Sequence, residues 1–342
     1  MESNKTLLIG CGINIAFNHA FKVKSSFFRS NFTYAEILPK MFNDTSDSCD
    51  LKSKFKMYLN NYNNDLEEFL RYNFSGAIGS LCENERKEIK NEFIRILGNN
   101  HRDVTFKLSL QDGDFQFFKE NLKAYNRIYT TNFDLKLYFL MDKLELFGNK
   151  NNKYKLFNDC FYPRKNENCS VGDFEMYPFN ETTPKFWSLL YLHGSMHLLS
   201  CSEIEFDALK IANVQSRNLI EKREKLCRSG QFHDLFVLGG TTEEKLNIIE
   251  HNSYLKNALE SLKNIEGDLV IYGCSIDDND AHIWKTICDS RVNNIYIGIS
   301  NDCSDRNFYR INEHFKNKKI TTYCHDDNNI WEDGWINKVT DC

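Results

Sequence analysis

The stretch KTLLIGCGINIAFNHA, residues 5–20, decides the fold class of this chain. Residues 5–9, which include the short apolar run of residues 7–9, predict a buried strand, and residues 13–20 have the pattern of a helix. Gly10 and Gly12 between them supply a tight turn. A strand, a glycine turn and a helix in this order are typical of the opening of a Rossmann-like α/β fold.

The chain returns to this alternation after a long interruption. Residues 35–125 have mostly helical spacing with charged outer faces, so they predict a mostly helical insertion. We predict an α/β protein whose Rossmann-like parallel sheet is formed by residues 1–34 and 126–342. Apolar runs predict its further strands at residues 127–131, 189–192, 268–272, 294–299 and 319–323.

The composition excludes several classes of protein. Hydrophobic residues make up 41% of the 342 residues and aromatic residues 14%, which excludes intrinsic disorder for most of the chain. The formal net charge of −5 disfavours sequence-independent nucleic-acid binding, which needs a basic surface. No apolar run approaches the roughly 18 residues that span a bilayer, and the first residues do not have the pattern of a signal peptide. We therefore expect a cytoplasmic protein that binds no membrane.

Polar or glycine-rich motifs follow four of the predicted strands. Because ligands bind at the carboxyl ends of parallel strands, these motifs are expected to line one edge of the sheet. They are GCGIN at residues 10–14, TTNFD at residues 130–134, HGS at residues 193–195 and GCSIDDND at residues 273–280.

In this order the four motifs resemble the NAD site of the sirtuin fold. More closely, the chain is similar to the bacterial sirtuin-like domains of anti-phage defence proteins. Within that group it is similar to a family described only as a domain of unknown function. The closer likeness is carried by residues 235–245 and 267–284, and the resemblance extends from residue 7 to about residue 300.

The resemblance implies an activity and a set of site residues. It implies that the protein hydrolyses NAD to nicotinamide and ADP-ribose, as an NAD-depleting effector of bacterial anti-phage defence. It implies that Asn132, Asp134 and His193 are catalytic. The residues that it implies for holding the NAD are Gly10, Gly12, Asn14, Thr131, Gly273, Ser275 and Asp278.

The resemblance and the cysteine pattern also imply what accompanies the site. The 12 cysteines contain no C-x-x-C pair, whereas protein-deacylating sirtuins carry two such pairs around zinc. We therefore expect no zinc and no other metal. Loss of NAD is toxic to a cell, so we expect a homo-oligomer or a regulatory protein partner to restrain the activity.

The side chains expected to be catalytic have chemistry that suits cleavage of an N-glycosidic bond. An imidazole such as that of His193 can accept a proton near neutral pH. The carboxamide of Asn132 can orient a water molecule or the nicotinamide. The carboxylate of Asp134 can stabilise positive charge that develops on the ribose.

Each of these assignments has an alternative. Asn132 and Asp134 can cap the helix that begins beside them, and His193 can be a core histidine with no ligand. Asp278 and Asp280 can be ribose or structural contacts or helix caps, and His282 is expected as a packing or rim residue. At the level of function, the alternatives are an NAD-dependent deacylase or ADP-ribosyltransferase and a non-catalytic sensor of NAD or ADP-ribose.

Overall fold

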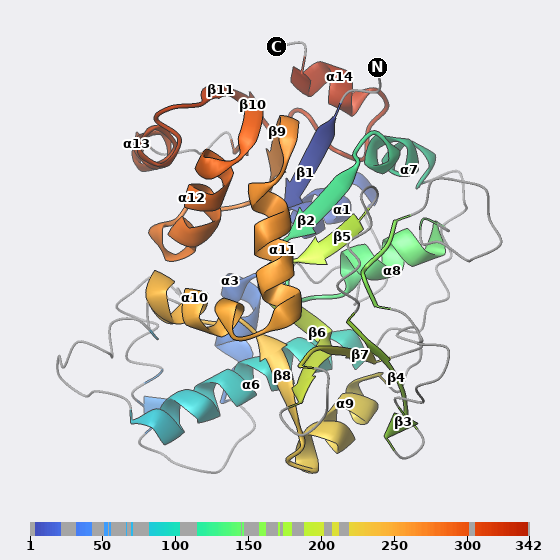
Figure 1. Cartoon of the computed structure of the whole chain (residues 1–342), viewed down its shortest axis with the longest axis vertical. Coiled ribbons are helices and arrows are strands. Elements are labelled where there is room, and N and C mark those ends of the chain that lie inside the picture. The colour runs from blue at the N-terminus through green and yellow to red at the C-terminus, as the bar shows by residue number, and fades with distance from the viewer. Residues whose placement is uncertain are drawn as a thin grey trace.

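The computed structural model contains two β-sheets with helices packed around them (Figure 1). It describes residues 4–21, 32–42, 51–53, 55, 66, 70, 82–102, 115–144, 146, 157–161, 170–171, 174–179, 188–201, 207–211, 219–300 and 305–340.

The larger sheet has six strands in the order β11-β10-β9-β1-β2-β5, and every neighbouring pair is parallel. The chain runs from β1 through β2 to β5 on one side, and then crosses to β9 on the other side of β1. This is the strand order of a doubly wound Rossmann fold, which confirms the predicted fold class. The strands are β1 (Lys5–Ile9), β2 (Arg127–Thr130), β5 (Ser188–Tyr191), β9 (Glu266–Tyr272), β10 (Arg291–Ile299) and β11 (Lys319–Cys324).

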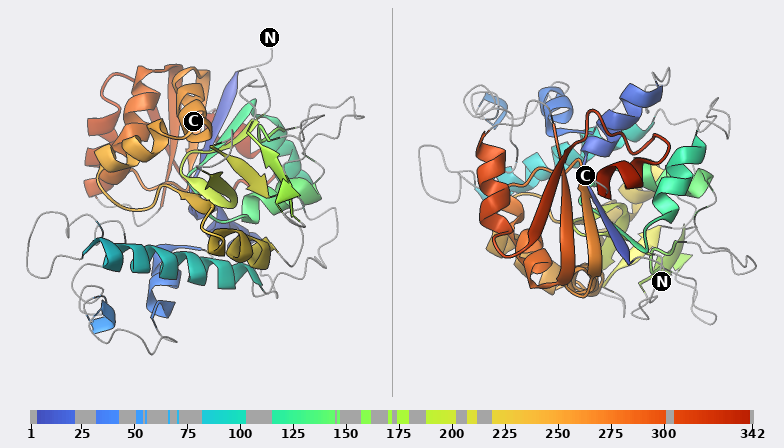
Figure 2. Two further views of the ribbon diagram at one scale, coloured as in Figure 1. Left: turned by 60° about the horizontal axis from the view of Figure 1, so that its bottom comes forward. Right: turned by 90° about the horizontal axis from the view of Figure 1, so that it is seen from above.

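Helices cover both faces of the parallel sheet, so its central strands are buried on both sides. Leu7, Leu8 and Ile9 of β1 have no exposed surface, as expected for an interior strand of a parallel sheet. Figure 1 shows α11 and α12 in front of the sheet and α1 behind it, and Figure 2 (right) shows helices on either side of the strands. The helices around this sheet are α1 (Gly12–Phe21), α7 (Gln116–Lys123), α8 (Lys136–Lys143), α10 (Thr242–Glu250), α11 (Ser253–Lys263), α12 (Ala281–Asp289), α13 (Asp305–His314) and α14 (Trp335–Thr340).

The second sheet is antiparallel and was not expected from the sequence. Its order is β3-β4-β7-β6-β8. Strand β6 follows β5 after a two-residue turn and is buried along most of its length. The alternation of apolar and polar residues that marks an antiparallel strand is therefore missing from it. The strands are β3 (Ser170–Val171), β4 (Phe174–Pro178), β6 (Gly194–Cys201), β7 (Leu209–Ile211) and β8 (Phe232–Phe236), and helix α9 (Leu219–Arg228) precedes β8.

The described part of residues 35–125 is mostly helical, as predicted. It contains the end of α3 (Tyr34–Ile37), the 3-10 helix η1 (Leu38–Lys40), α6 (Glu83–Arg102) and α7. A further helix expected at residues 65–70 lies outside the described residues, apart from Leu66 and Leu70. Helix α6 is the long helix that crosses the lower part of the molecule in Figure 1 and in the left view of Figure 2, and it contacts α9.

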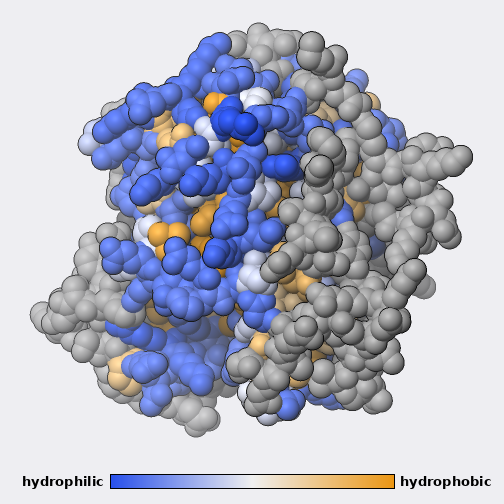
Figure 3. Space-filling view, viewed as in Figure 1, coloured by the Kyte–Doolittle hydropathy of each residue, from blue (hydrophilic) through white to orange (hydrophobic). Residues whose placement is uncertain are grey.

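The surface of the described residues is mainly hydrophilic on the face shown in Figure 3. Among these residues, no helix is long and apolar enough to span a membrane.

The turn between β5 and β6 joins the two sheets and requires a glycine. Gly194 has a φ of +76°, and a Cβ added to it would lie 1.8 Å from the carbonyl oxygen of Leu235. Gly230 has nearly the same φ, +78°, but an added Cβ would meet no atom within 4 Å. The two glycines therefore have the same backbone strain and differ in the space around them.

We predict that Gly230→Ala lowers the free energy of unfolding by about 1–2 kcal/mol, the cost of a left-handed backbone. Gly194→Ala is expected to lower it clearly further, because the backbone of β8 must also move. Urea denaturation of both variants measures the difference. Equal losses would contradict the close approach of β8 to the turn.

Candidate functional site

The carboxyl ends of four adjacent strands meet at one cavity, as the sequence predicts. The cavity has a volume of about 120 Å³ and lies beyond β9, β1, β2 and β5, which are neighbours in the sheet. Seven of the ten residues implied by the resemblance line it. They are Gly10, Thr131, Asn132, Asp134, His193, Gly273 and Ser275.

The first glycine motif packs directly against the backbone that follows β9. The Gly12 N–H donates to the Gly273 carbonyl at 2.9 Å, and a Cβ on Gly12 would lie 2.4 Å from the Gly273 Cα. Gly12 does not line the cavity. The N–H groups of Ile13 and Asn14 donate to the carbonyls of Gly10 and Cys11. The glycines are thus needed for the close contact of two loops. That they hold the NAD, through its pyrophosphate at this helix start, stays a prediction.

Asn132 stands at the centre of the site, directly after β2. Its side chain is 7% exposed, and Nδ2 donates to the Gly10 carbonyl at 3.3 Å. Its backbone N–H donates to Oγ1 of Thr130 at 3.1 Å. These two bonds hold the carboxamide at the wall of the cavity.

Asp134 lines the cavity, and its carboxylate bonds the first residue of α8. The N-cap of α8 is Leu135, without a side-chain cap bond, so Asp134 is not the predicted helix cap. Oδ1 accepts the N–H of Lys136 at 2.8 Å, and Oδ2 accepts Nδ2 of Asn14 at 3.0 Å. Burial raises the pKa of Asp134, and the hydrogen bonds from Lys136 and Asn14 oppose this rise. Asn14 is 1% exposed and holds the carboxylate from behind. It is therefore a support of the site and does not line the cavity.

His193 is held by the turn between β5 and β6. Its carbonyl accepts the N–H of Val237 at 2.9 Å, and its ring stacks on Phe133 with centroids 6.4 Å apart. The carbonyl of Phe133 accepts Oγ of Ser195 at 3.0 Å, which ties this turn to the loop after β2. Burial lowers the pKa of His193 to about 3, so the ring is neutral at pH 7 and one of its two nitrogens has a free lone pair.

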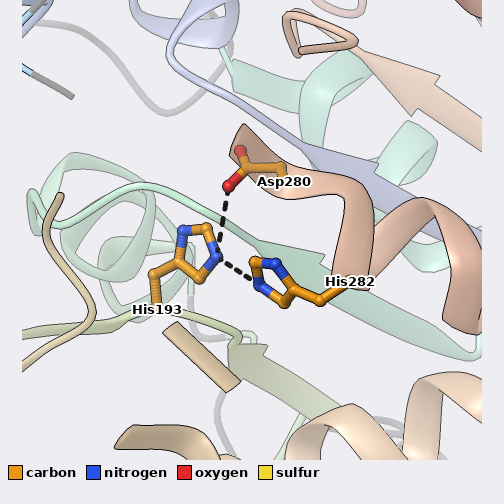
Figure 4. Close-up of side chains that lie close together, drawn as sticks. All are labelled: His193, Asp280 and His282. Carbon is orange, nitrogen blue, oxygen red and sulfur yellow. Dashed lines mark hydrogen bonds and ion pairs between the residues drawn. The ribbon is translucent and has the colours of Figure 1, made fainter. Parts of the chain in front are cut away.

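Three further residues lie around His193. The sequence analysis gave Asp280 as a ribose or structural contact or a helix cap, and His282 as a packing or rim residue, and it did not name Lys245. Nε2 of His193 lies 3.1 Å from Nε2 of His282 and 3.6 Å from Oδ1 of Asp280 (Figure 4). The same oxygen accepts Nζ of the fully buried Lys245 at 2.8 Å. The Asp-x-His spacing at the start of α12, after a strand end, was the available signal for Asp280 and His282. No sequence signal pointed to Lys245.

This cluster is the place in the described residues where a metal could be held. One nitrogen of each histidine and one oxygen of Asp280 lie within 4.8 Å of one another. The ammonium group of Lys245 already neutralises Asp280, which weakens the carboxylate as a metal ligand. The absence of a metal therefore stays a prediction.

Asp278 is the implied site residue that the structure places elsewhere. Its side chain is 55% exposed and pairs with Arg310 and His314 of α13, at 3.6 and 3.2 Å. The 3-10 turn η3 (Asp278–Asp280) sends these two aspartates in different directions, and it is Asp280 that reaches the cavity. Asp278 does not line the cavity, and its role in holding the ligand stays a prediction.

Residues just before and within the insertion form one wall of the cavity. Phe32, Thr33 and Tyr34 contribute from the segment before and at α3, and Phe93 and Leu97 contribute from α6. Trp284 of α12 completes the aromatic lining. The sequence analysis placed no site residue in the insertion.

The fold and the site together define a doubly wound α/β protein with a polar and aromatic cavity at its strand ends. The chain matches the family model described as "Domain of unknown function (DUF4917)" over residues 7–331 and belongs to this family. A search of curated proteins found no match.

A buried histidine links the insertion to the site and should make folding sensitive to acid. Nδ1 of His101 bonds the Leu97 carbonyl at 2.7 Å, and Nε2 accepts the N–H of Leu135 at 3.2 Å. Burial lowers the pKa of His101 to about 4 from an ordinary 6.5. A proton on Nε2 would face the N–H of Leu135, so the folded chain resists protonation.

We predict that the free energy of unfolding falls as the pH decreases from about 6.5 towards about 4. In this window the unfolded chain binds a proton that the folded chain does not, and each such histidine contributes at most about 1.4 kcal/mol per pH unit. Urea denaturation at several pH values measures the slope. His101→Gln should flatten it, whereas substitution of the exposed His251 by Gln should not.

Proposed function

We propose that the protein hydrolyses NAD to nicotinamide and ADP-ribose. The observation that supports this most is the position of Asn132 and His193 at one cavity beside the crossing point of the sheet, between β1 and β9. Doubly wound sheets bind dinucleotides at this point, where the strand order reverses. The resemblance to sirtuin-like domains supports the same ligand independently.

The cavity suits one end of the NAD molecule. Its volume of about 120 Å³ is below the roughly 300–1,000 Å³ of a pocket for a whole drug-sized ligand. Aromatic side chains and the polar Asn132 and His193 share its lining. We place the nicotinamide ring and its ribose here, because a flat polar ring can stack on aromatic side chains. The rest of the dinucleotide would extend past the exposed Ser275.

The reaction requires little covalent help from the protein. The bond between C1′ of the ribose and the ring nitrogen breaks, and nicotinamide leaves with the electron pair. The oxygen of a water molecule forms the new bond to C1′, and its proton passes to His193 and then to solvent. Asn132 would orient the water or the carboxamide of the leaving group.

A role in anti-phage defence and restraint by a homo-oligomer or a partner protein are part of this proposal. Both are supported by the resemblance, and the toxicity of NAD loss supports the need for restraint. The defence role predicts that cells producing the wild-type chain lose NAD when the enzyme is active.

We predict that the purified chain releases nicotinamide from NAD. Asn132→Ala and His193→Ala should reduce the rate by about 10²–10⁴, the usual contribution of a positioned proton acceptor or its partner. Chromatography of the products measures nicotinamide and ADP-ribose, and calorimetry measures NAD binding. Asn264→Ala and His251→Ala, at exposed positions outside the cavity, are matched controls.

Two outcomes would count against hydrolysis, and a third would count against the proposed site. NAD binding without nicotinamide release, in the purified chain and in cells, would favour a sensor. Nicotinamide release that depends on an acylated peptide would favour a deacylase. Release that survives both substitutions would place the chemistry elsewhere.

A further inference from the structure

Two side chains from a different segment meet one ring nitrogen of His193. Nε2 of His193 faces Nε2 of His282 at 3.1 Å and Oδ1 of Asp280 at 3.6 Å. Figure 4 shows His193 on one side, and Asp280 and His282 reaching it from the start of α12. Both imidazoles are almost fully buried. Within the described residues the polar contacts of the His193 ring thus gather on Nε2, and Nδ1 is the nitrogen that remains for a ligand.

Asp280 is held in its charged form at this place. Nζ of Lys245 lies 2.8 Å from Oδ1, and the Lys245 side chain has no exposed surface. Burial of Asp280 opposes its ionisation, but the charge of Lys245 and the neighbouring imidazoles outweigh burial and hold its pKa below the usual range. A buried ammonium group needs a charged partner, so Lys245 keeps a carboxylate beside His193.

The carboxylate decides which nitrogen of His193 carries the proton. A neutral imidazole has one N–H and one lone pair. A lone pair on Nε2 of His193 would be repelled by the charged Asp280 oxygen. An N–H on Nε2 is instead attracted to that oxygen, and it donates its hydrogen bond to Nε2 of His282. His282 then carries its own proton on Nδ1, which is buried without a hydrogen-bond partner within the described part of the chain. The attraction of the N–H to Asp280 offsets the cost of that unpaired group.

We propose that Asp280 and His282 are positioning residues that hold His193 as the tautomer with its proton on Nε2, so that Nδ1 receives the proton of the attacking water. The choice of His193 as the base rests on the proposed function, whereas the tautomer does not. When C1′ exchanges its bond to nicotinamide for a bond to the water oxygen, the water proton moves to Nδ1. The imidazolium then has N–H groups on both nitrogens, and Asp280 stabilises its charge.

Nuclear magnetic resonance of the full chain with ¹⁵N-labelled histidine tests the tautomer directly. His193 is assigned by the signal that His193→Gln removes. We expect a protonated Nε2 and a bare Nδ1 at pH 7, and the reverse would overturn the proposal. In Asp280→Asn the introduced amide can accept from Lys245 and donate to Nε2 of His193. That variant should therefore move the His193 proton to Nδ1.

Kinetics test whether the tautomer matters for catalysis. Asp280→Asn should reduce kcat for nicotinamide release by about 10²–10⁴ with little change in KM, because it alters the base and not the NAD site. Asp277→Asn, in the adjoining turn and paired with Arg310, is the matched control that should keep wild-type kcat. His282→Gln retains an acceptor for the Nε2 proton and should keep most activity, whereas His282→Leu should lose it.

The outcomes separate this inference from the proposed function. If Asp280→Asn moves the His193 proton to Nδ1 but keeps the wild-type kcat, the positioning role is overturned and NAD hydrolysis is unaffected. A wild-type chain that releases no nicotinamide, but has His193 protonated on Nε2, would contradict the proposed function and support the tautomer. Thermal unfolding of each variant identifies any loss of activity that is caused by loss of the fold.

Discussion

The contact of two backbones at the crossing point of the sheet is the constraint on which the rest of the site depends. Gly12 and Gly273 approach so closely that a Cβ on either would overlap the other residue. The N–H of Gly10 donates to the carbonyl of Tyr272, which adds a second bond between the same loops. Asn132 then bonds the Gly10 carbonyl, so the loop after β2 takes its position from the same contact.

The second level of organisation is electrostatic. Lys245 of α10, Asp280 before α12 and His193 after β5 lie far apart in the sequence, and they meet because of charge and hydrogen bonding. Burial of Lys245 is tolerable only beside Asp280. The ion pair therefore fixes a carboxylate against an imidazole that is otherwise surrounded by apolar groups. The apolar surroundings keep the imidazole neutral, and the carboxylate gives it a preferred orientation.

The sequence predicts the parallel sheet and the convergence of the four motifs well, because each rests on local signals. Leu7, Leu8 and Ile9 form an apolar run, and Asn132 and His193 directly follow the predicted strands at residues 127–131 and 189–192. The antiparallel sheet escapes prediction because β6 is buried on both faces and lacks alternation. Asp278 and Asp280 are the same residue type two positions apart, so the sequence pattern cannot separate their roles. The geometry of a 3-10 turn decides which of them reaches the cavity. The burial of Lys245 escapes prediction because a lysine on an amphipathic helix is usually exposed, and only the tertiary contact with Asp280 accounts for it.

The polar groups and the steric limits of the cavity come from different parts of the chain. Strand ends of the doubly wound sheet supply its polar groups, whereas Phe32, Tyr34, Phe93 and Leu97 supply steric limits from segments at or within the insertion. The polar lining and the steric limits of the cavity thus come from separable stretches of chain. A change within the insertion can therefore alter the shape of the cavity and leave the polar groups at the strand ends unchanged.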